Sequence, residues 1–506
     1  MEPGVAFLSR EADRCPTRAG PRGMSEGQVN QMKIHVRFSS REESARTIAK
    51  PLTSVLQFGC GLLMLGVLYA AGAAETPGAQ TLSLTLEQAI RMAQEGNPGY
   101  RSTLTAGEVA EFDFETARRK RYPRVDLFAS YLGAPIEDKR LIPRTLLENL
   151  PQNEKFDSQI ATVGMRARVP VYVGGRIDAE IGAAQSQRER FDFESRQTLD
   201  DLVFDVTRTF YTLLVLERIR EAELASLEDL EESQRVIQQL LDVGRAARLE
   251  LLRMQTRVSN VRQALIRNQS AVDTAQARLR RLLGLDDADR RSLRLVGELR
   301  YEPENPGDRQ ALVTQALKQR PGYRALEAEL ASQDQRQRIA RSERRPQVNL
   351  DAVYLGAAGL DRNSSADDAT LFLTFSLPIF DGGVIRSRVN RANARYRQLQ
   401  QRLQDLRLQV RFEVQQSLDA IREAGERVKN TEAALAAAQE ALRVEQKKLA
   451  AGKGIINDVL DAQSDALSVE VDLAKALADH RIALAALARA TGRSTISITD
   501  ADKQTP

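Results

Sequence analysis

The chain has 506 residues, of which 28% are charged and 42% are hydrophobic, and it contains no tryptophan. This composition is typical of long helices and coiled coils rather than of one compact core. The formal net charge is only +4, and arginine and glutamate are interleaved along the chain, so the sequence excludes the basic face that a nucleic-acid-binding protein needs.

The N-terminal part has the pattern of an exported protein. Residues 50–74 read KPLTSVLQFGCGLLMLGVLYAAGAA, in which a basic residue precedes an apolar stretch and a run of small residues. This pattern predicts a signal peptide cleaved after Ala73 or Ala74; the alternative is a membrane anchor. Residues 1–49 are then an N-terminal extension, either disordered or upstream of the true start. Cys15 and Cys60 both precede the cleavage point, so the mature chain is expected to have no disulfide.

The rest of the chain is an internal duplication. PGYR occurs at 98–101 and again at 321–324. Farther along, RVPVYVGGRI at 168–177 corresponds to SLPIFDGGVI at 376–385. Each copy has the pattern of a helix, two strands and two long helices. We expect a first repeat at 81–284, a linker at 285–307, a second repeat at 308–492 and a polar tail at 493–506.

Two segments of each copy alternate apolar and polar side chains with the period of a strand. In the first copy they are 123–131 and 159–169, and each run has roughly the length that a tilted strand needs to cross a bilayer. Half-buried strands of a soluble sheet alternate in the same way, so the pattern leaves both interpretations open. A membrane barrel has about eight or more strands, so the four strands of one chain are too few to close one. An open sheet would leave the backbone groups at its edges without hydrogen bonds in lipid, which is costly. Strands in a membrane would therefore require an oligomer.

The helical segments predict long, extended helices rather than a compact domain. Apolar residues of the first copy recur at steps of three and four from Leu199 to Leu213, and those of the second do so from Leu399 to Val410. This spacing predicts a coiled-coil seam. A helix from Gly175 to Val243 would be about 90–100 Å long.

These features together resemble the TolC family of outer-membrane channels. The resemblance rests on TLEQAIRMAQEGNP at 85–98, on the duplicated strand–Pro–Gly-Gly junctions and on GKGIINDVLDAQSDAL at 452–467. It implies a mainly α fold with membrane β-strands, in which three chains form one channel. Four strands from each protomer would build a shared β-barrel in the outer membrane, and the long helices would continue it through the periplasm.

The resemblance also implies a function and partners. Such channels are exit ducts of tripartite efflux pumps or type I secretion systems, and they bind a periplasmic adaptor and an inner-membrane transporter of the RND, MFS or ABC class. No cofactor is expected. The cargo is left open, because the inner-membrane transporter selects it.

Several residues match functional positions of the family. Asp458 and Asp461, three apart on one helix face, match the acidic pair that lines the constricted periplasmic entrance. Glu250 matches an acidic residue that latches the closed entrance. The family's tyrosine and arginine partners would fall at Leu449 and Gly454, which cannot form those bonds. The cations predicted to substitute for them are Arg245, Arg248 and Lys453.

Other matches are structural or concern partner binding. Val243, Gly244 and Gly452 match the hairpin tips that adaptors engage. Arg166 and Arg168 are on the polar side of their strand and are predicted to line the barrel lumen. Prolines are expected to end the strands and glycines to redirect the chain at the strand–helix junctions. The junction residues are Pro170, Gly174, Gly175, Pro378, Gly382 and Gly383.

Two other classes of function are less well supported. An enzyme is less well supported because no histidine-based catalytic triad or histidine-rich metal site can form. The two histidines are His35, ahead of the signal peptide, and His480, isolated in a helix. A soluble periplasmic coiled-coil scaffold or adaptor fits the helical hairpins but leaves the two matched strand pairs unexplained.

Overall fold

The computed structural model describes residues 81–133, 159–286, 291–360, 364–451 and 453–493. The predicted N-terminal extension and signal peptide, and all but the first residue of the predicted tail, lie outside these ranges. The chain divides into two compact units. One contains the four longer strands and the other contains the helices, and we describe each by itself.

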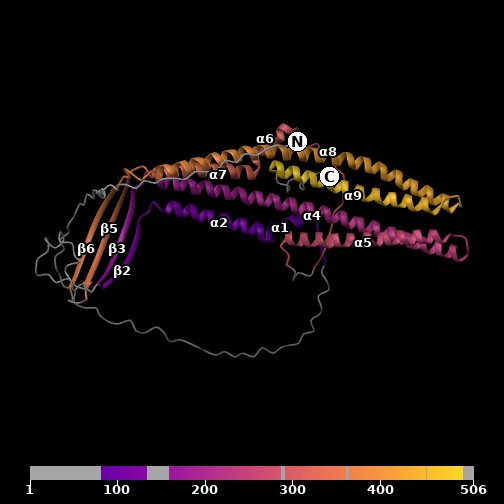
Figure 1. The fold of residues 1–506 in the computed structure, drawn as a ribbon, viewed down its shortest axis with the longest axis horizontal. Coiled ribbons are helices and arrows are strands. Elements are labelled where there is room, and N and C mark those ends of the chain that lie inside the picture. The colour runs from indigo at the N-terminus through magenta and orange to yellow at the C-terminus, as the bar shows by residue number, and fades with distance from the viewer. Residues whose placement is uncertain (1–80, 134–158, 287–290, 361–363, 452, 494–506) are drawn as a thin grey trace, which may run out of the picture. The chain divides into compact units, whose positions relative to one another are not determined.

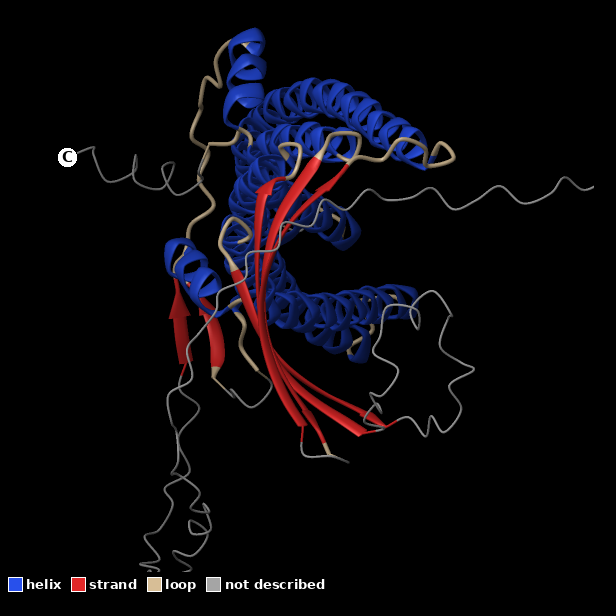
Figure 2. Ribbon diagram, turned by 90° about the vertical axis from the view of Figure 1, so that its left-hand side faces the viewer, coloured by secondary structure: helices blue, strands red, loops and turns tan. Residues whose placement is uncertain are grey.

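The strand unit is one four-stranded sheet (Figure 2). Its strands are β2 (Arg124–Gly133), β3 (Gln159–Tyr172), β5 (Gln347–Gly359) and β6 (Ser364–Ser376), in the order β2-β3-β5-β6. β2 pairs with β3 in antiparallel register, and β5 pairs with β6 in the same way. The two predicted strand pairs are therefore confirmed, and they lie beside each other.

One face of this sheet is apolar and exposed. Leu127 is 74% exposed, and its neighbours on that face are exposed as well; they include Val125, Tyr131, Val163, Met165, Leu371 and Phe375. A sheet of a soluble protein usually buries its apolar face on a core. The exposed apolar face supports the membrane interpretation of the alternating pattern.

The helical unit repeats the same series of helices twice (Figure 1). The first series is α1 (Leu86–Gly96), α2 (Pro98–Arg119), α4 (Arg176–Asp242) and α5 (Arg248–Leu283). The second is α6 (Arg309–Gln319), α7 (Pro321–Ser342), α8 (Val384–Ala450) and α9 (Ile456–Thr491). α4 and α8 have 67 residues each and are about 100 Å long. The predicted duplication and the predicted helix length are confirmed. Among the described residues, no helix combines the length and apolar character needed to span a membrane.

The helix expected ahead of each strand pair is in fact two helices. The breaks fall at Asn97-Pro98 and Arg320-Pro321, where proline occupies the first position of α2 and of α7. Proline is favourable there, and it keeps the preceding residue out of the helical conformation. Asn97 strengthens the first break, because its side chain accepts a hydrogen bond from the Tyr100 N–H (3.0 Å) and donates one to the Leu282 carbonyl (2.9 Å).

A second, smaller sheet was not predicted. β1 (Thr81–Leu84) pairs in parallel with β4 (Ser292–Leu295), which lies inside the segment interpreted as a linker. Each strand has four residues, too few for a clear alternating pattern. The leucine at every second position of TLSL and SLRL was the available signal.

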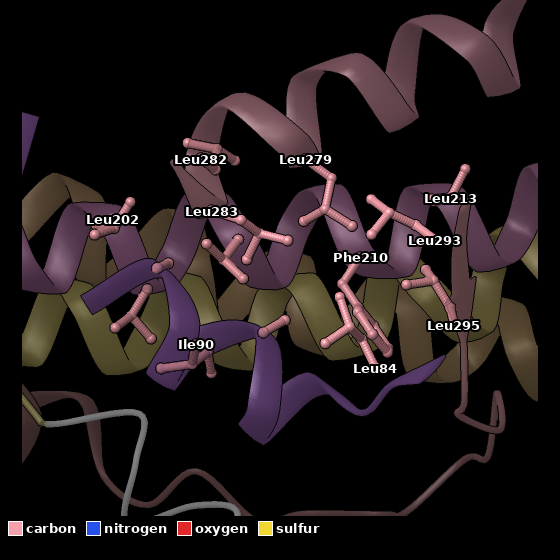
Figure 3. Packing of buried hydrophobic residues seen from close by; sticks show 14 of the residues in the cluster. Leu84, Ile90, Leu202, Phe210, Leu213, Leu279, Leu282, Leu283, Leu293 and Leu295 are labelled. Carbon is pink, nitrogen blue, oxygen red and sulfur yellow. The ribbon is translucent and has the colours of Figure 1, made fainter. Parts of the chain in front are cut away.

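Each repeat forms its own apolar core. The buried residues of the first core lie between Leu84 and Leu295 and include Phe210 and Leu213 of the predicted seam (Figure 3). Those of the second lie between Leu312 and Ala490 and include Val410 and Val414. The coiled-coil seams are therefore the parts of α4 and α8 that these cores bury.

Asp200 on α4 gives a pH-dependent prediction. Partial burial, together with the neighbouring Asp201 carboxylate, raises the pKa of Asp200 from 3.8 to about 6. The unfolded chain therefore loses this proton first, and stability falls as the pH rises from about 4 to 6. Asp200→Asn is expected to raise the free energy of unfolding at pH 7.5 by about 1–2 kcal/mol, after allowance for solvent screening, and to have little effect at pH 4.

The measurement is the midpoint of thermal unfolding at the two pH values. Asp201→Asn is the matched control, because the Asp201 carboxylate accepts a hydrogen bond from Gln197 and faces Arg489 at 3.6 Å. That variant also relieves the smaller, electrostatic cause of the raised pKa of Asp200, so at pH 7.5 it should gain less stability than Asp200→Asn. An equal gain from Asp201→Asn, or no gain from Asp200→Asn, would contradict the assignment.

Candidate functional site

The first helical hairpin turns between α4 and α5. Gly244 has φ +71°, a left-handed conformation that favours glycine. The turn is closed by hydrogen bonds from the Gly244 N–H to the Leu241 carbonyl (2.9 Å) and from the Arg245 N–H to the Leu240 carbonyl (2.7 Å). Val243 is exposed beside it. The first predicted adaptor-binding tip is therefore an exposed, tightly turned hairpin end.

The second hairpin turns between α8 and α9. The Lys448 carbonyl accepts hydrogen bonds from the Lys453 N–H (2.9 Å) and the Gly454 N–H (3.0 Å). Lys453 is exposed. Gly452, predicted as part of this tip, lies outside the described residues.

The two hairpins pack against each other near their tips. The buried cluster there combines Leu230 and Ile237 of α4 with Met254 and Val258 of α5, and Leu460 of α9 completes it. Met254 is fully buried. Apolar contact therefore holds α9 against the first hairpin, next to the predicted entrance residues.

Asp458 and Asp461 have different surroundings. Both are exposed; Asp458 lies in the first turn of α9, where a helix N-terminus favours a carboxylate, and Asp461 lies in the next turn. The Asp458 side chain forms no hydrogen bond or ion pair with any other described residue. Asp461 forms an ion pair with Arg257 of α5. The two carboxylates predicted to line the entrance together are thus one unpaired charge and one charge offset by a cation.

Glu250 lies close to the two departures from the family pattern. It borders a cleft of about 540 Å³ together with Arg245, Leu449 and Gly454. The structure therefore brings the predicted latch position next to the two residues that replace the family's partners. In the described part of the chain, Glu250 forms no ion pair with Arg245, Arg248 or Lys453.

Polar contacts also join the two hairpins, and apart from Asp461 their residues were not predicted from the sequence. Arg218 of α4 forms an ion pair with Glu470 of α9 (3.0 Å), and the Gln463 side chain donates a hydrogen bond to the Asp229 carboxylate (3.2 Å). The Arg257–Asp461 pair belongs to the same series. Gln463 and Glu470 are one heptad apart, and that spacing was the signal available in the sequence.

The first strand–helix junction is covered by another part of the chain. Gly174 and Gly175 have φ +66° and +79°. The Arg345 guanidinium donates a hydrogen bond to the Gly174 carbonyl (3.0 Å). The expected strand end is wrong by two residues, because β3 continues past Pro170 to Tyr172. Pairing with β2 ends at Arg168, so the missing N–H of Pro170 removes no hydrogen bond from that ladder.

The second junction is stabilised locally. Gly382 and Gly383 have φ +63° and +88°, and β6 ends at Ser376, two residues before Pro378. The Asp381 carboxylate accepts hydrogen bonds from the Gly383 N–H (3.0 Å) and the Ile385 N–H (2.6 Å). These bonds lower the pKa of Asp381. The two junctions share their glycines but not the group that stabilises the turn.

Arg166 and Arg168 lie on the polar face of β3. The Arg168 guanidinium forms an ion pair with Asp351 of β5 (2.6 Å), and Arg166 lies 5.3 Å from the centre of the Phe128 ring. Both are exposed on the face opposite to the apolar one. Their role in lining a lumen stays a prediction.

Comparison with known proteins identifies relatives of the whole duplicated region. The sequence model of the family described as "Outer membrane efflux protein" matches residues 89–285 and 312–493. The outer membrane efflux protein BepC of Brucella suis is 27% identical over 356 residues, which cover 66% of this chain and 72% of BepC. The cobalt-zinc-cadmium resistance protein CzcC of Cupriavidus metallidurans is 25% identical over 331 residues, covering 65% and 76% of the two chains.

A solved structure has the same fold. A membrane protein from Pseudomonas aeruginosa superposes with a TM-score of 0.71 at 23% identity, covering 80% of this chain and 93% of that one. At this identity, the likeness supports the fold and not the roles of single residues.

Proposed function

The chain belongs to the outer membrane efflux protein family, and on that basis we propose that its two hairpin tips form the periplasmic entrance of the channel, with Asp458 as the charged constriction. The channel itself lies in the outer membrane with its helical part in the periplasm, and it is an exit duct for efflux. Proteins of this family are channels rather than enzymes.

The proposal depends on the unpaired carboxylate of Asp458. Its carboxylate is exposed on the first turn of α9 and has no partner among the described residues. In a homotrimer, three such carboxylates would surround one axis. A ring of carboxylates attracts cations and repels anions. Asp458 therefore gives the entrance its preference for cations, and Asp461 contributes less because Arg257 offsets its charge.

We propose that this chain latches its entrance through different residues from those matched in the family. Glu250 faces Leu449 and Gly454, which offer no side-chain charge. Other polar contacts join α9 to the first hairpin instead, and the one nearest the tips is Arg257–Asp461. Opening the entrance requires the hairpins to separate, so this ion pair opposes opening.

The partners follow from the same proposal. Residues 50–74 direct export, three chains assemble in outer-membrane lipid, and the exposed tip at Val243 and Gly244 binds a periplasmic adaptor of an RND, MFS or ABC transporter. The names of the two relatives refer to efflux and to metal resistance. Both suit a duct whose cargo is selected by the inner-membrane transporter, in an efflux pump or a type I secretion system.

Asp458→Asn tests the constriction. We expect the ratio of cation to anion permeability to fall several-fold in planar-bilayer recordings, together with weaker block by multivalent cations, because the ring loses its charge. Asp242→Asn is the control, since Asp242 is an exposed carboxylate at the end of α4 whose side chain bonds to Gln238. An unchanged ratio in Asp458→Asn, or an equal change in Asp242→Asn, would refute the assignment.

A further inference from the structure

The linker between the repeats crosses the long helices. After β4, residues 296–308 form neither helix nor strand. A Cβ atom on Gly297 would lie 3.2 Å from side-chain atoms of both Phe210 and Leu214, so the linker backbone rests directly on α4. Farther along the linker, Tyr301 contacts both helices of the second hairpin. The linker therefore connects the core of the first repeat to the α8–α9 hairpin.

Tyr301 and Glu302 attach the linker to the second hairpin. The centre of the Tyr301 ring lies 4.9 Å from that of His480 on α9, with an angle of 65° between the ring planes. On α8, a Cβ atom at Gly425 would lie 3.0 Å from the Tyr301 hydroxyl oxygen, so the missing side chain leaves room for the tyrosine. Glu302 forms an ion pair with Arg481 (2.9 Å). Together these contacts form a linker pin.

The imidazole of His480 is buried in the linker pin. It is 2% exposed, and its Nδ1 has no hydrogen-bond partner among the described residues. Burial is the largest cause that lowers the pKa of His480, and the Arg481 cation adds to it, whereas the Glu302 carboxylate acts in the opposite direction. A buried charge without a partner is costly, so the packed contact requires the neutral imidazole.

The carboxylates that the structure describes around this contact, on the linker, α8 and α9, already have cations. The pairs are Glu302–Arg481 (2.9 Å), Glu426–Lys429 (2.9 Å) and Asp479–Arg427 (2.6 Å). From α4, the residues that border the adjoining cleft carry no charge near neutral pH; they are Thr207, Phe210 and Tyr211. An imidazolium formed here would therefore add a cation without a carboxylate of its own.

The corresponding position of the first repeat is apolar. The duplication places Val272 where the second repeat has His480. Val272 is 1% exposed and belongs to the same buried cluster as Leu293 and Leu295 of β4. The histidine is therefore specific to the hairpin that carries Asp458.

We propose that the linker pin holds the second hairpin in the closed arrangement of the entrance, and that a proton on His480 releases it. α8 and α9 run side by side to a shared tip (Figure 1). Because the pin lies about 35 Å along α9 from its first residue, a small tilt there displaces the tip that carries Asp458. This proposal rests on the proposed entrance and adds the groups that make its opening depend on pH.

Acid weakens the pin by a definite amount. The exposed imidazole of a released hairpin has the ordinary histidine pKa of about 6.5, and the pKa of the packed imidazole is lower. The released arrangement therefore binds the extra proton, and the pin is lost progressively as the pH falls below about 6.5. Between pH 7.5 and 5.5, the ratio of released to pinned hairpin should rise by up to about tenfold per chain.

Planar-bilayer recording at pH 7.5 and pH 5.5 tests the release. The ratio of open to closed time should rise about tenfold in acid, and His480→Gln, which cannot take up a proton in this range, should remove most of the rise. Asp200→Asn is the control, because Asp200 also titrates near pH 6 but lies outside the pin, so this variant should respond as the wild type does. No rise in the wild type, or an equal rise in His480→Gln, would overturn the release.

Gly425→Ala tests the pin without changing a titratable group. The added Cβ atom would press on the Tyr301 hydroxyl, and alanine is a better helix former than glycine, so the fold should be retained. The ratio of open to closed time at pH 7.5 should rise several-fold. Adding Tyr301→Phe, which removes the hydroxyl, should restore the wild-type ratio. An unchanged ratio in Gly425→Ala, or no restoration in the double variant, would overturn the pin.

A titration of His480 itself separates this proposal from the proposed entrance. In the full chain with His35→Gln, His480 is the single histidine, so its ring C–H signal can be followed by NMR. The midpoint should lie below about 6.5, and Gly425→Ala should move it closer to that value. A midpoint of about 6.5 in both proteins would overturn the pin, whatever the channel does. A low midpoint together with unchanged permeability in Asp458→Asn would overturn the entrance and leave the linker contact intact.

Discussion

In a channel with Arg257→Glu, the ratio of open to closed time is expected to be about 10 to 100 times that of the wild type. The change removes the Arg257–Asp461 ion pair and places two carboxylates together. An exposed ion pair contributes about 0.2–1 kcal/mol, so three of them in a trimer contribute about 0.6–3 kcal/mol to the closed entrance. Loss of the pairs and repulsion between the exposed, screened carboxylates together are expected to total about 1.4–2.8 kcal/mol, which corresponds to this change in the ratio of open to closed channel. Single-channel recording gives the open fraction directly.

Two further variants distinguish a latch from a general charge effect. Arg262→Glu is the matched control, because Arg262 pairs with Glu231 within the first hairpin (2.6 Å) and does not join the hairpins. It should leave the open fraction unchanged. Arg257→Glu combined with Asp461→Arg restores an ion pair with reversed polarity and should close the channel again. A double variant as open as the single one would refute the latch.

Gly174→Ala is expected to lower the free energy of unfolding by about 2–5 kcal/mol. Gly174 has φ +66°, which disfavours any side chain. A Cβ atom there would also lie 2.8 Å from the Ser342 carbonyl oxygen and 2.8 Å from the Arg345 Cβ. Both contacts are too short, and neither atom is the end of a flexible side chain. The readout is the midpoint of denaturant unfolding.

Gly244→Ala separates the two causes. Gly244 has φ +71°, but a Cβ atom there would meet nothing within 4 Å. Gly244→Ala should therefore lower the free energy of unfolding only by the cost of the left-handed conformation, about 1–2 kcal/mol. If the two substitutions destabilise the protein equally, the packing of Arg345 on the first junction contributes nothing.

The sequence predicts the elements of this fold whose signals are long or repeated. The 67-residue helices follow from long runs without proline, each with a single glycine (Gly182 and Gly425), and from the seam around Phe210. The four strands follow from alternation that occurs in two matched pairs. β1 and β4 were missed because four residues carry little periodicity, and their pairing joins segments far apart in the chain. The break at Asn97-Pro98 was readable from the proline alone.

The site was predictable only in part, for a different reason. Asp458 and Asp461 are recognisable in one motif, but their spacing says nothing about Arg257, which is 204 positions away in the chain. The same limit applies to Gly174 and Gly382, which look equivalent in the duplicated motif. Their difference depends on Arg345, which reaches Gly174 from outside the motif. Contacts between repeats depend on packing that neither repeat shows by itself.

The separate cores of the two repeats bear on how such a chain arose. The first core uses residues between Leu84 and Leu295, and the second uses residues between Leu312 and Ala490. A polypeptide of half this length, with one strand pair and one hairpin, could therefore bury its own core. It would need six copies to complete the circle that three full chains complete. Fusion of two halves makes every second boundary covalent, and it lets the two copies diverge, as the first junction with its Arg345 contact and the second with its Asp381 hydrogen bonds have done.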